Sequence, residues 1–280
     1  MASSLSPADL GGFRSSFSGL LFGPNDDGYD AARGIWNGAI DRRPAAIARC
    51  SSADQVVAAI RFARDKDLEI AVRGGGHSFA GFSVCEGGLM IDLSGMRQVT
   101  VDPASRRAVA AGGATWGDLD AATQEHGLAV TGGFISHTGI GGLTLGGGIG
   151  HLTRIAGLSC DNLAGAEVVT ADGQILRAGP DDHGDLFWAL RGGGGNFGVV
   201  TSFDYRLHQI GPMVNFGLFF WPADRGAEAL AFGRQFVNDA AEPFGFICVV
   251  DAERDKPQPA TDDEYADLSG ARSLVGKLRR

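Results

Sequence analysis

The chain of 280 residues contains 44% hydrophobic and 20% charged residues, and its formal net charge is −9. This composition is typical of a globular protein with one or two domains, and its acidity disfavours nucleic-acid and anionic-membrane partners. No apolar stretch reaches the roughly 18 residues that a membrane span needs, and the first residues lack a secretion signal. We therefore expect a cytoplasmic protein without a membrane segment.

The predicted elements begin at residue 45, because residues 1–44 are poorly patterned. Ser52-Ala53-Asp54-Gln55 has the spacing of a capping box, in which side chains satisfy free N–H groups at a helix start. Apolar residues then follow on one helical face. The pattern predicts a strand over 45–50, a helix from Ser52, strands over 68–72 and 88–93, and a hairpin of 98–102 with 107–111.

The second half of the chain predicts another set of mixed elements, which favours an α+β fold over a doubly wound sheet. These are a helix over 116–126 capped by Thr115, a hairpin of 166–170 with 174–177, a helix over 182–190 and a strand over 199–207. Beyond Gly211-Pro212 we expect a strand over 214–221, a helix over 224–237 and a strand over 244–250. Residues 251–280 are polar and are predicted to be disordered.

The four cysteines lie far apart and show no CxxC spacing. Neither a metal site nor a disulfide scaffold is therefore expected. Buried free thiols are the simpler explanation for Cys50, Cys85, Cys160 and Cys248.

Glycine is abundant, and the 44 glycines cluster in three segments. The first is Arg73-Gly74-Gly75-Gly76-His77-Ser78, which follows a predicted strand. Glycines there let backbone N–H groups approach an anion closely, as in phosphate-binding loops. A tight turn with a surface histidine explains this segment equally well.

The second glycine segment, 138–150, carries no charge over thirteen residues. A solvent loop would be polar, and a core helix would use fewer glycines, so we predict a buried loop against a large, partly flat ligand. Neither a Walker A nor a Rossmann fingerprint is present, so a nucleotide cofactor would bind by another route. In the third segment, 191–200, Asn196-Phe197-Gly198 favours ligand binding over a flexible hinge.

Four motifs, taken together and in this order, resemble the FAD-binding domain of the vanillyl-alcohol-oxidase and para-cresol-methylhydroxylase (PCMH) superfamily. The chain is most similar to the berberine-bridge-enzyme-like oxidases, over roughly residues 40–212. The motifs are Arg73–Ser78, Thr138–Gly150, Arg154–Leu158 with Asp161–Leu163, and Gly193–Gly198.

The resemblance implies an α+β fold with a PCMH-type FAD-binding domain of two α+β subdomains over 41–212. An N-terminal segment, 1–40, precedes it, and the start of a substrate domain, 213–250, and the tail, 251–280, follow it. Relatives continue well beyond this length, so we expect a C-terminally truncated chain. Among relatives the missing part often supplies a catalytic base, so no catalytic residue is assigned.

The resemblance also implies that Arg73–Ser78 wraps the FAD pyrophosphate and that His77 bonds covalently to the flavin 8-methyl carbon. Many relatives have a second, cysteine tether, but Ile135 stands at that position, so His77 is expected to be the only tether. The implied cofactor-binding residues are Arg73, Gly74, Gly75, Gly76, His77, Ser78, Thr138, Gly139, Gly141, Gly142, Thr144, Gly147, Gly148, Gly150, Asn196, Gly198 and Val200.

Other polar and aromatic residues near these motifs have ordinary structural explanations. His137 and His151 are expected to be polar ends of the glycine-rich loop, and carboxylates near a helix start are favoured by the helix dipole. The residues that we leave structural, without a catalytic role, are His137, His151, Asp118, Asp120, Trp116, Cys160 and Tyr205.

The implied function is an FAD-dependent oxidase that takes hydride from a CH–OH or CH–N group of a small molecule, with O2 as the electron acceptor. A flavin-binding module without catalytic activity is the alternative, because most of the substrate domain is missing. A Rossmann-type NAD dehydrogenase is a third and weaker reading.

Overall fold

The computed structural model describes residues 5–211 and 220–239. The chain forms two compact units, and the second of them contains residues 220–239. That unit has a 3-10 turn, η2 (Ala223–Arg225), followed by helix α8 (Gly226–Asp239), which confirms the predicted helix. The strand predicted over 244–250 and the tail over 251–280 lie outside the described residues, as does most of the strand predicted over 214–221.

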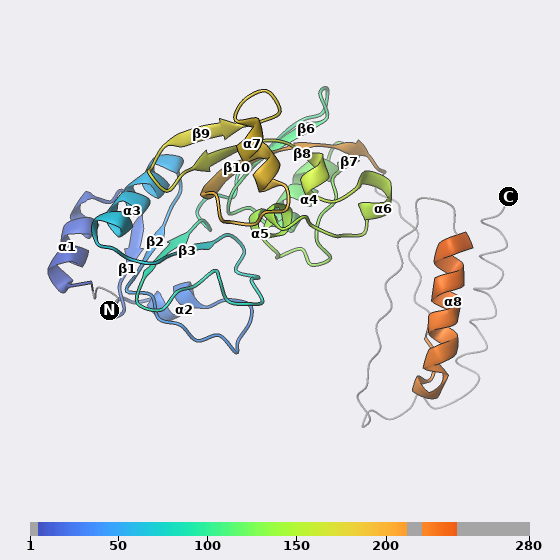
Figure 1. Cartoon of the computed structure of the whole chain (residues 1–280), viewed down its shortest axis with the longest axis horizontal. Helices are drawn as coiled ribbons and strands as arrows, with labels where there is room; N and C mark the ends of the chain where they lie inside the picture. Colours follow the sequence, from blue (N-terminus) through green and yellow to red (C-terminus); the bar gives the residue numbers. More distant parts are fainter. Residues whose placement is uncertain (1–4, 212–219, 240–280) are drawn as a thin grey trace. The chain divides into compact units, whose positions relative to one another are not determined.

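The first sheet of the larger unit has four strands in the order β1-β2-β4-β3. Strands β1, β2 and β3 are labelled in Figure 1. Both β2 and β3 run parallel to β4, and β1 pairs antiparallel with β2. The chain crosses from β2 to β3 through α3, and β4 lies between these two strands in the sheet. The bounds are β1 Leu20–Phe22, β2 Ala46–Arg49, α3 Ala53–Asp65, β3 Ile70–Arg73 and β4 Leu89–Asp92.

Helix α3 starts much as its sequence predicts. The Ser52 side chain accepts a hydrogen bond from the backbone N–H of Gln55, 3.3 Å away. The Gln55 side chain reaches back to the N–H of Ser51, one residue earlier than a capping box requires. Both contacts satisfy donors that the first helical turn leaves free.

The second sheet has five antiparallel strands in the order β5-β6-β10-β8-β9 and contains both predicted hairpins. A two-stranded sheet pairs β7 with β11. The strand bounds are β5 Val99–Asp102, β6 Arg107–Ala111, β7 Leu128–Ala129, β8 Leu163–Val169, β9 Ile175–Ala178, β10 Val199–Arg206 and β11 His208–Gln209. The mixture of helices with this sheet and with the mixed first sheet confirms the α+β class.

Short helices connect the strands of the second sheet. They are α4 Trp116–Gln124, α6 Thr153–Ala156, the 3-10 turn η1 Cys160–Asn162 and α7 Gly184–Leu190. Thr115 caps α4 in a capping box with Asp118, which confirms a structural role for that carboxylate.

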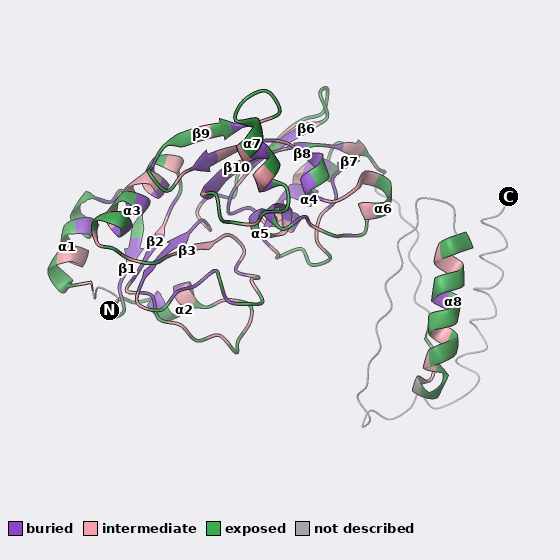
Figure 2. Cartoon of the chain, viewed as in Figure 1, coloured by how far each residue is buried: buried purple, intermediate pink, exposed green. Residues whose placement is uncertain are grey.

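Each sheet has its own hydrophobic core, and Figure 2 shows buried residues concentrated on the strands. Trp116, Phe203 and Tyr205 are fully buried in the core of the second sheet. Burying a large apolar side chain stabilises a fold by roughly 1.5–3 kcal/mol. The core role predicted for Trp116 is therefore confirmed.

The three cysteines in the described part of the chain are buried and unbridged, as the sequence predicts. Burial raises the pKa of the Cys50 thiol to about 12 and that of the Cys85 thiol to about 11. Neutral buried thiols act as small apolar side chains. Cys160 is one of them, so its predicted core role is also confirmed.

Two regions differ from the sequence-based expectation. Residues before 45 contain α1 (Pro7–Ser16), β1 and α2 (Tyr29–Arg33). These elements are short or, in α1, weakly apolar on one side, so periodicity does not reveal them. The glycine run expected to be a loop contains helix α5 (Ile140–Leu145), in which an added Cβ at Gly141 would touch the Phe203 ring. At 3.5 Å this is ordinary van der Waals contact, which does not by itself require glycine there.

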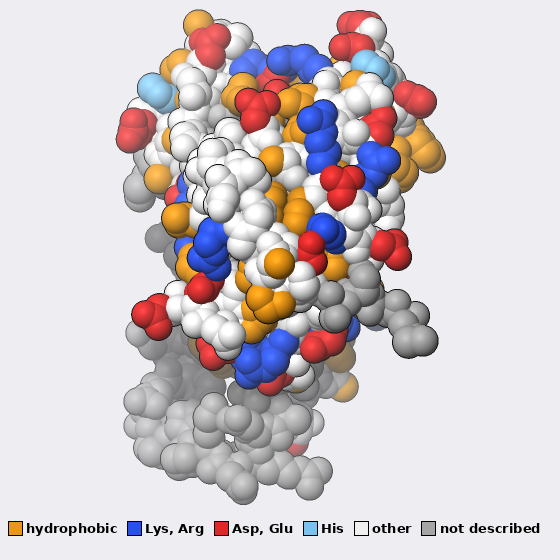
Figure 3. Space-filling view, turned by 90° about the vertical axis from the view of Figure 1, so that its left-hand side faces the viewer, with side chains coloured by type: hydrophobic (Ala, Val, Ile, Leu, Met, Phe, Trp, Pro, Cys, Tyr) orange, Lys and Arg blue, Asp and Glu red, His pale blue; other side chains and the backbone are white. Residues whose placement is uncertain are grey.

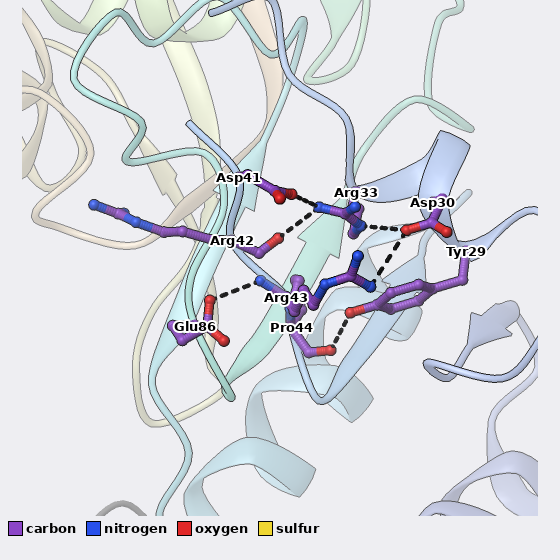
Figure 4. A network of polar contacts seen from close by, with 8 residues as sticks. All are labelled: Tyr29, Asp30, Arg33, Asp41, Arg42, Arg43, Pro44 and Glu86. Carbon is purple, nitrogen blue, oxygen red and sulfur yellow. Dashed lines mark hydrogen bonds and ion pairs between the residues drawn. The ribbon is translucent and has the colours of Figure 1, made fainter. Parts of the chain in front are cut away.

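A polar network ties the residues around α2 to β2 and to residue 86 (Figure 4). The Tyr29 hydroxyl donates to the carbonyl of Pro44 across 2.6 Å, and the Arg33 side chain binds Asp30 and Asp41. The backbone N–H of Arg43 donates to the Glu86 carboxylate across 2.8 Å. The network anchors both ends of residues 34–40, the segment that reaches His77.

Charged side chains of both signs are interspersed on the face at the α1 end of the larger unit (Figure 3). Mixed signs produce no extended field of a single sign there. Among the described helices, none is long and apolar enough to cross a membrane.

Candidate functional site

The first and second glycine segments meet in space. Strand β3 ends at Arg73, and Gly139 is the N-cap of α5. A Cβ added at Gly75 would lie 2.1 Å from the backbone nitrogen of Gly139, and one added at Gly139 would lie 2.2 Å from that of Gly75. The two backbones are therefore in direct contact, which only glycine permits.

The second segment is held in place by backbone hydrogen bonds to the start of α4. The N–H of Trp116 donates to the Thr138 carbonyl, and the N–H of Ile140 donates to the Ala114 carbonyl, both at 3.0 Å. This pairing presents His137 and Thr138 to the loop that follows β3.

His77 is the centre of an aromatic and polar cluster. Its Nε2 lies 2.7 Å from Nδ1 of His137, and its Nδ1 lies 3.4 Å from the Thr138 hydroxyl. The Trp36 ring stacks on the imidazole, with centroids 5.4 Å apart and planes 19° apart. Partial burial, and secondly the nearby His137, lower the pKa of His77 below the ordinary histidine value. A neutral imidazole with an available lone pair is the form that acts as a nucleophile.

The loop after β3 has spare hydrogen-bond donors. In the described part of the chain, the backbone N–H groups of Gly74, Gly75, Gly76 and His77 donate no hydrogen bond. The buried Nε of Arg73 also lacks a partner, although another nitrogen of its guanidinium donates to the Ala32 carbonyl. Unpaired donors, of which the Arg73 Nε is buried, favour an anionic ligand, and this set fits a pyrophosphate.

The glycines at the end of the second segment are required by backbone conformation and by packing within the protein. Gly147 and Gly148 have φ of +109° and +88°, and a Cβ at Gly148 would lie 2.4 Å from the Ser159 hydroxyl. A Cβ at Gly150 would lie 1.6 Å from the Gly132 carbonyl. The Thr144 hydroxyl is buried and paired with the Tyr205 hydroxyl at 2.7 Å. These positions owe their residue types to tertiary packing, whatever ligand lies beside them.

The third glycine segment borders a cavity. Asn196 and Gly198 border a cavity of about 500 Å³, whose apolar wall includes Ile70 and Val72 of β3. The Asn196 side chain donates to the Gly193 carbonyl at 2.9 Å. Gly198 has φ of +137°, and a Cβ there would lie 2.5 Å from the Val169 carbonyl. Val200 is buried in β10.

The second and third segments are joined by one backbone hydrogen bond, from the N–H of Gly194 to the Leu145 carbonyl at 2.9 Å. The structure thus connects all three glycine segments. Gly141 and Gly142 lie in α5, and Gly142 has open space beside it.

The sequence did not predict two of the residues that contact His77, namely His137 and Trp36. His137 was assigned to an ordinary loop end, yet its ring pairs with His77, 60 residues away. Trp36 belongs to a segment without any pattern. The other loop-end histidine, His151, lies edge-on to Phe134, with ring centroids 4.8 Å apart. No local signal distinguishes His137 from His151, because the difference lies in their distant neighbours.

Large apolar side chains are exposed at Trp36 and on the segments that carry His77 and His137. Exposed apolar side chains gathered in one region mark ligand or partner surfaces. They are Trp36, Phe79, Phe82, Phe134 and Ile135. Among the described residues, no group of three or more His, Cys, Asp or Glu side chains is placed to hold a metal ion.

Comparisons with known proteins agree with this arrangement. Residues 44–179 match the family model of an FAD binding domain. The chain is 41% identical over 206 residues to (R)-6-hydroxynicotine oxidase of Paenarthrobacter nicotinovorans, covering 74% of this chain and 45% of that protein.

Solved structures show the same fold. A berberine-bridge-enzyme-like protein of Physcomitrella patens is 31% identical with a TM-score of 0.69, over 71% of this chain and 44% of that one. Glucooligosaccharide oxidase of Acremonium strictum, which carries a 6-S-cysteinyl, 8α-N1-histidyl FAD, is 33% identical with a TM-score of 0.69, over 72% and 43% of the two chains.

The fold and the glycine segments define an FAD-binding domain of the PCMH type. The chain contains this FAD-binding domain, which FAD-linked oxidoreductases share. It spans about half the length of the curated relatives that it matches, 45% of one and 52% of another.

Proposed function

We propose that this chain binds FAD, attaches it covalently through His77 alone, and serves an FAD-dependent oxidase that acts on a small molecule. The observation that carries the proposal is the position of His77, hydrogen-bonded to His137 and stacked on Trp36, at the end of a loop with unpaired backbone donors. We place the FAD-binding domain at residues 41–212 and the start of a substrate domain at 213–250.

The loop after β3 would hold the cofactor's pyrophosphate. The N–H groups of Gly74–His77 and the Nε of Arg73 are donors without acceptors, and charge-assisted hydrogen bonds to phosphate oxygens would satisfy them. The Gly75–Gly139 contact keeps the second glycine segment beside this loop.

His77 would supply the covalent bond. Its Nε2 pairs with His137. Among the described residues Nδ1 has one hydrogen-bond contact, a long one to Thr138, so Nδ1 is the nitrogen left for attachment. Attachment would replace one C–H bond of the flavin 8-methyl group by a C–N bond to His77. The two protons and two electrons released, from that C–H bond and the imidazole N–H, would pass to dioxygen and give hydrogen peroxide. Ile135 carries no nucleophile, which supports a single tether.

Bound FAD supplies a two-electron acceptor for a C–H bond next to oxygen or nitrogen. The substrate class rests on the relatives, whose names include a hydroxynicotine oxidase and a glucooligosaccharide oxidase. We propose dioxygen as the final electron acceptor.

Acid precipitation tests the tether. The full chain, purified after expression with FAD and washed in acid, is expected to retain flavin in a 1:1 ratio, visible as fluorescence of the denatured band. His77→Ala should lose this acid-stable flavin, whereas the control Trp188→Ala, which changes an exposed side chain on α7, should keep it. Complete release of flavin from the unmodified chain would refute the covalent attachment.

A second candidate function is a flavin-binding module without turnover. The exposed apolar side chains around His77 favour it, because oxidation chemistry needs a site shielded from water. Hydrogen peroxide formation by the flavin-loaded chain, with hydroxynicotine or glucooligosaccharide as probe, would support the oxidase. Stably bound flavin without peroxide from such probes would support the module.

A further inference from the structure

Trp36 and Asn37 form a clamp on the loop that carries His77. The backbone N–H of Trp36 donates to the Gly76 carbonyl at 3.0 Å, and the Asn37 side chain donates to the Phe79 carbonyl at 2.8 Å. One hydrogen bond lies on each side of His77 in the chain. The clamp therefore holds the backbone from which the imidazole projects.

The Trp36 ring restrains the imidazole itself. Its centroid lies 5.4 Å from that of His77 with nearly parallel planes, although 57% of Trp36 is exposed. The His77 ring also pairs with His137 at Nε2, at 2.7 Å, and makes a longer contact of 3.4 Å with the Thr138 hydroxyl at Nδ1. A histidine ring turns freely over a broad range of its second torsion, so a stack and a hydrogen bond together are needed to hold it in one orientation.

The clamp is anchored away from His77. Preceding it, Arg33 binds Asp30 and Asp41. Following it, the Arg42 guanidinium donates to the carbonyls of Gly81 and Val84, both at 3.1 Å. These contacts make the Trp36 segment a support for the His77 loop on either side.

We propose that Trp36 is a positioning residue for flavin attachment: its ring holds the His77 imidazole so that the free nitrogen faces the flavin methyl carbon. This inference rests on the proposed function. A reacting nitrogen must approach its carbon along a narrow range of directions, and a small misplacement slows such reactions strongly. Trp36 acts on the rate of attachment and leaves reversible FAD binding to the glycine loops.

The test follows attachment over time. Flavin-free full-length chain is mixed with FAD in air, and acid-stable flavin is measured at intervals. Trp36→Ala and Trp36→Leu should attach flavin about tenfold more slowly or worse, while Trp36→Phe, which keeps a stacking ring, should stay within about threefold of the unmodified rate. Reversible binding, measured by fluorescence titration before attachment, should change little. Trp188→Ala is the matched control for loss of an exposed tryptophan.

A second measurement reports on the ring without cofactor. In flavin-free chain with labelled histidines, the His77 ring signals are assigned with His77→Gln. Stacking on an indole shifts the imidazole proton resonances upfield, so Trp36→Leu should move them downfield and Trp36→Phe should move them only partly. A purely structural role in folding would not give this graded order.

The outcomes separate the two proposals. Unmodified chain that never acquires acid-stable flavin would refute the tether, while the His77 signals would still decide whether Trp36 holds the ring. Attachment of flavin by Trp36→Leu at the rate of the unmodified chain would overturn the positioning role. His77 signals that are the same in Trp36→Leu and in the unmodified chain would also overturn it. If Trp36→Phe attached flavin as slowly as Trp36→Leu, the positioning role would also be overturned, because a stacked ring would then make no difference to the rate.

Discussion

The backbones of Gly75 and Gly139 lie so close together that neither residue has room for a β-carbon. Gly75 belongs to the loop after β3 of the first sheet, and Gly139 precedes α5 beside the second sheet. The contact therefore joins the two halves of the larger unit next to His77. It explains why both positions are glycine, and it makes them sensitive to the smallest side chain.

Alanine at either position should disrupt this junction. Gly75→Ala and Gly139→Ala each place a methyl group against backbone atoms, and we expect each to cost about 2 kcal/mol of unfolding free energy or more, as overpacking does. Both should also lose acid-stable flavin. Gly184→Ala, at an open position of α7, is the control and should leave unfolding free energy nearly unchanged. Urea unfolding measures all three; unaltered stability of the first two would contradict the contact.

The buried pair of Thr144 and Tyr205 should behave as a coupled unit. Thr144→Val leaves the Tyr205 hydroxyl buried without a partner, and such a loss costs about 1–3 kcal/mol. Tyr205→Phe should cost a similar amount, and the double variant should cost less than the sum of the two. Additive losses of unfolding free energy in the double-mutant cycle would argue against the hydrogen bond.

Stability should depend on pH through His77. Partial burial and the neighbouring His137 lower its pKa in the folded chain, so the folded state binds that proton less readily than the unfolded state. The resulting stability is present above the ordinary histidine pKa of about 6.5 and is lost as pH falls through the lower folded value. Between neutral and mildly acidic pH, unmodified chain should therefore lose more unfolding free energy than His77→Gln. Parallel pH profiles in urea unfolding would contradict this expectation.

Removing the Tyr29 hydroxyl from the N-terminal polar network should lower the unfolding free energy modestly. Tyr29 is buried, and its hydroxyl donates to the Pro44 carbonyl at the start of β2. Tyr29→Phe should lower the unfolding free energy by about 1 kcal/mol, the usual net value of one hydrogen bond. Thermal unfolding of both forms measures the difference. An unchanged midpoint would mean that water replaces the lost contact.

Local signals predicted most of the regular structure. Helix α3, the two hairpins and β10 follow from apolar periodicity and turn residues within short windows. The three-residue β1 and the five-residue α2 are too short for such signals. Helix α5 was missed because its glycines contradict helix propensity.

The sequence by itself determined the glycine segments, the histidine among them and their likeness to FAD-binding proteins, because these are properties of residue type and order. Only the tertiary structure decided what surrounds His77. Its neighbours Trp36 and His137 come from segments that lie far from it along the chain, and no local pattern marks either. Their meeting depends on how the two sheets and their loops are placed, which is set by long-range packing and strand order rather than by any short stretch of residues.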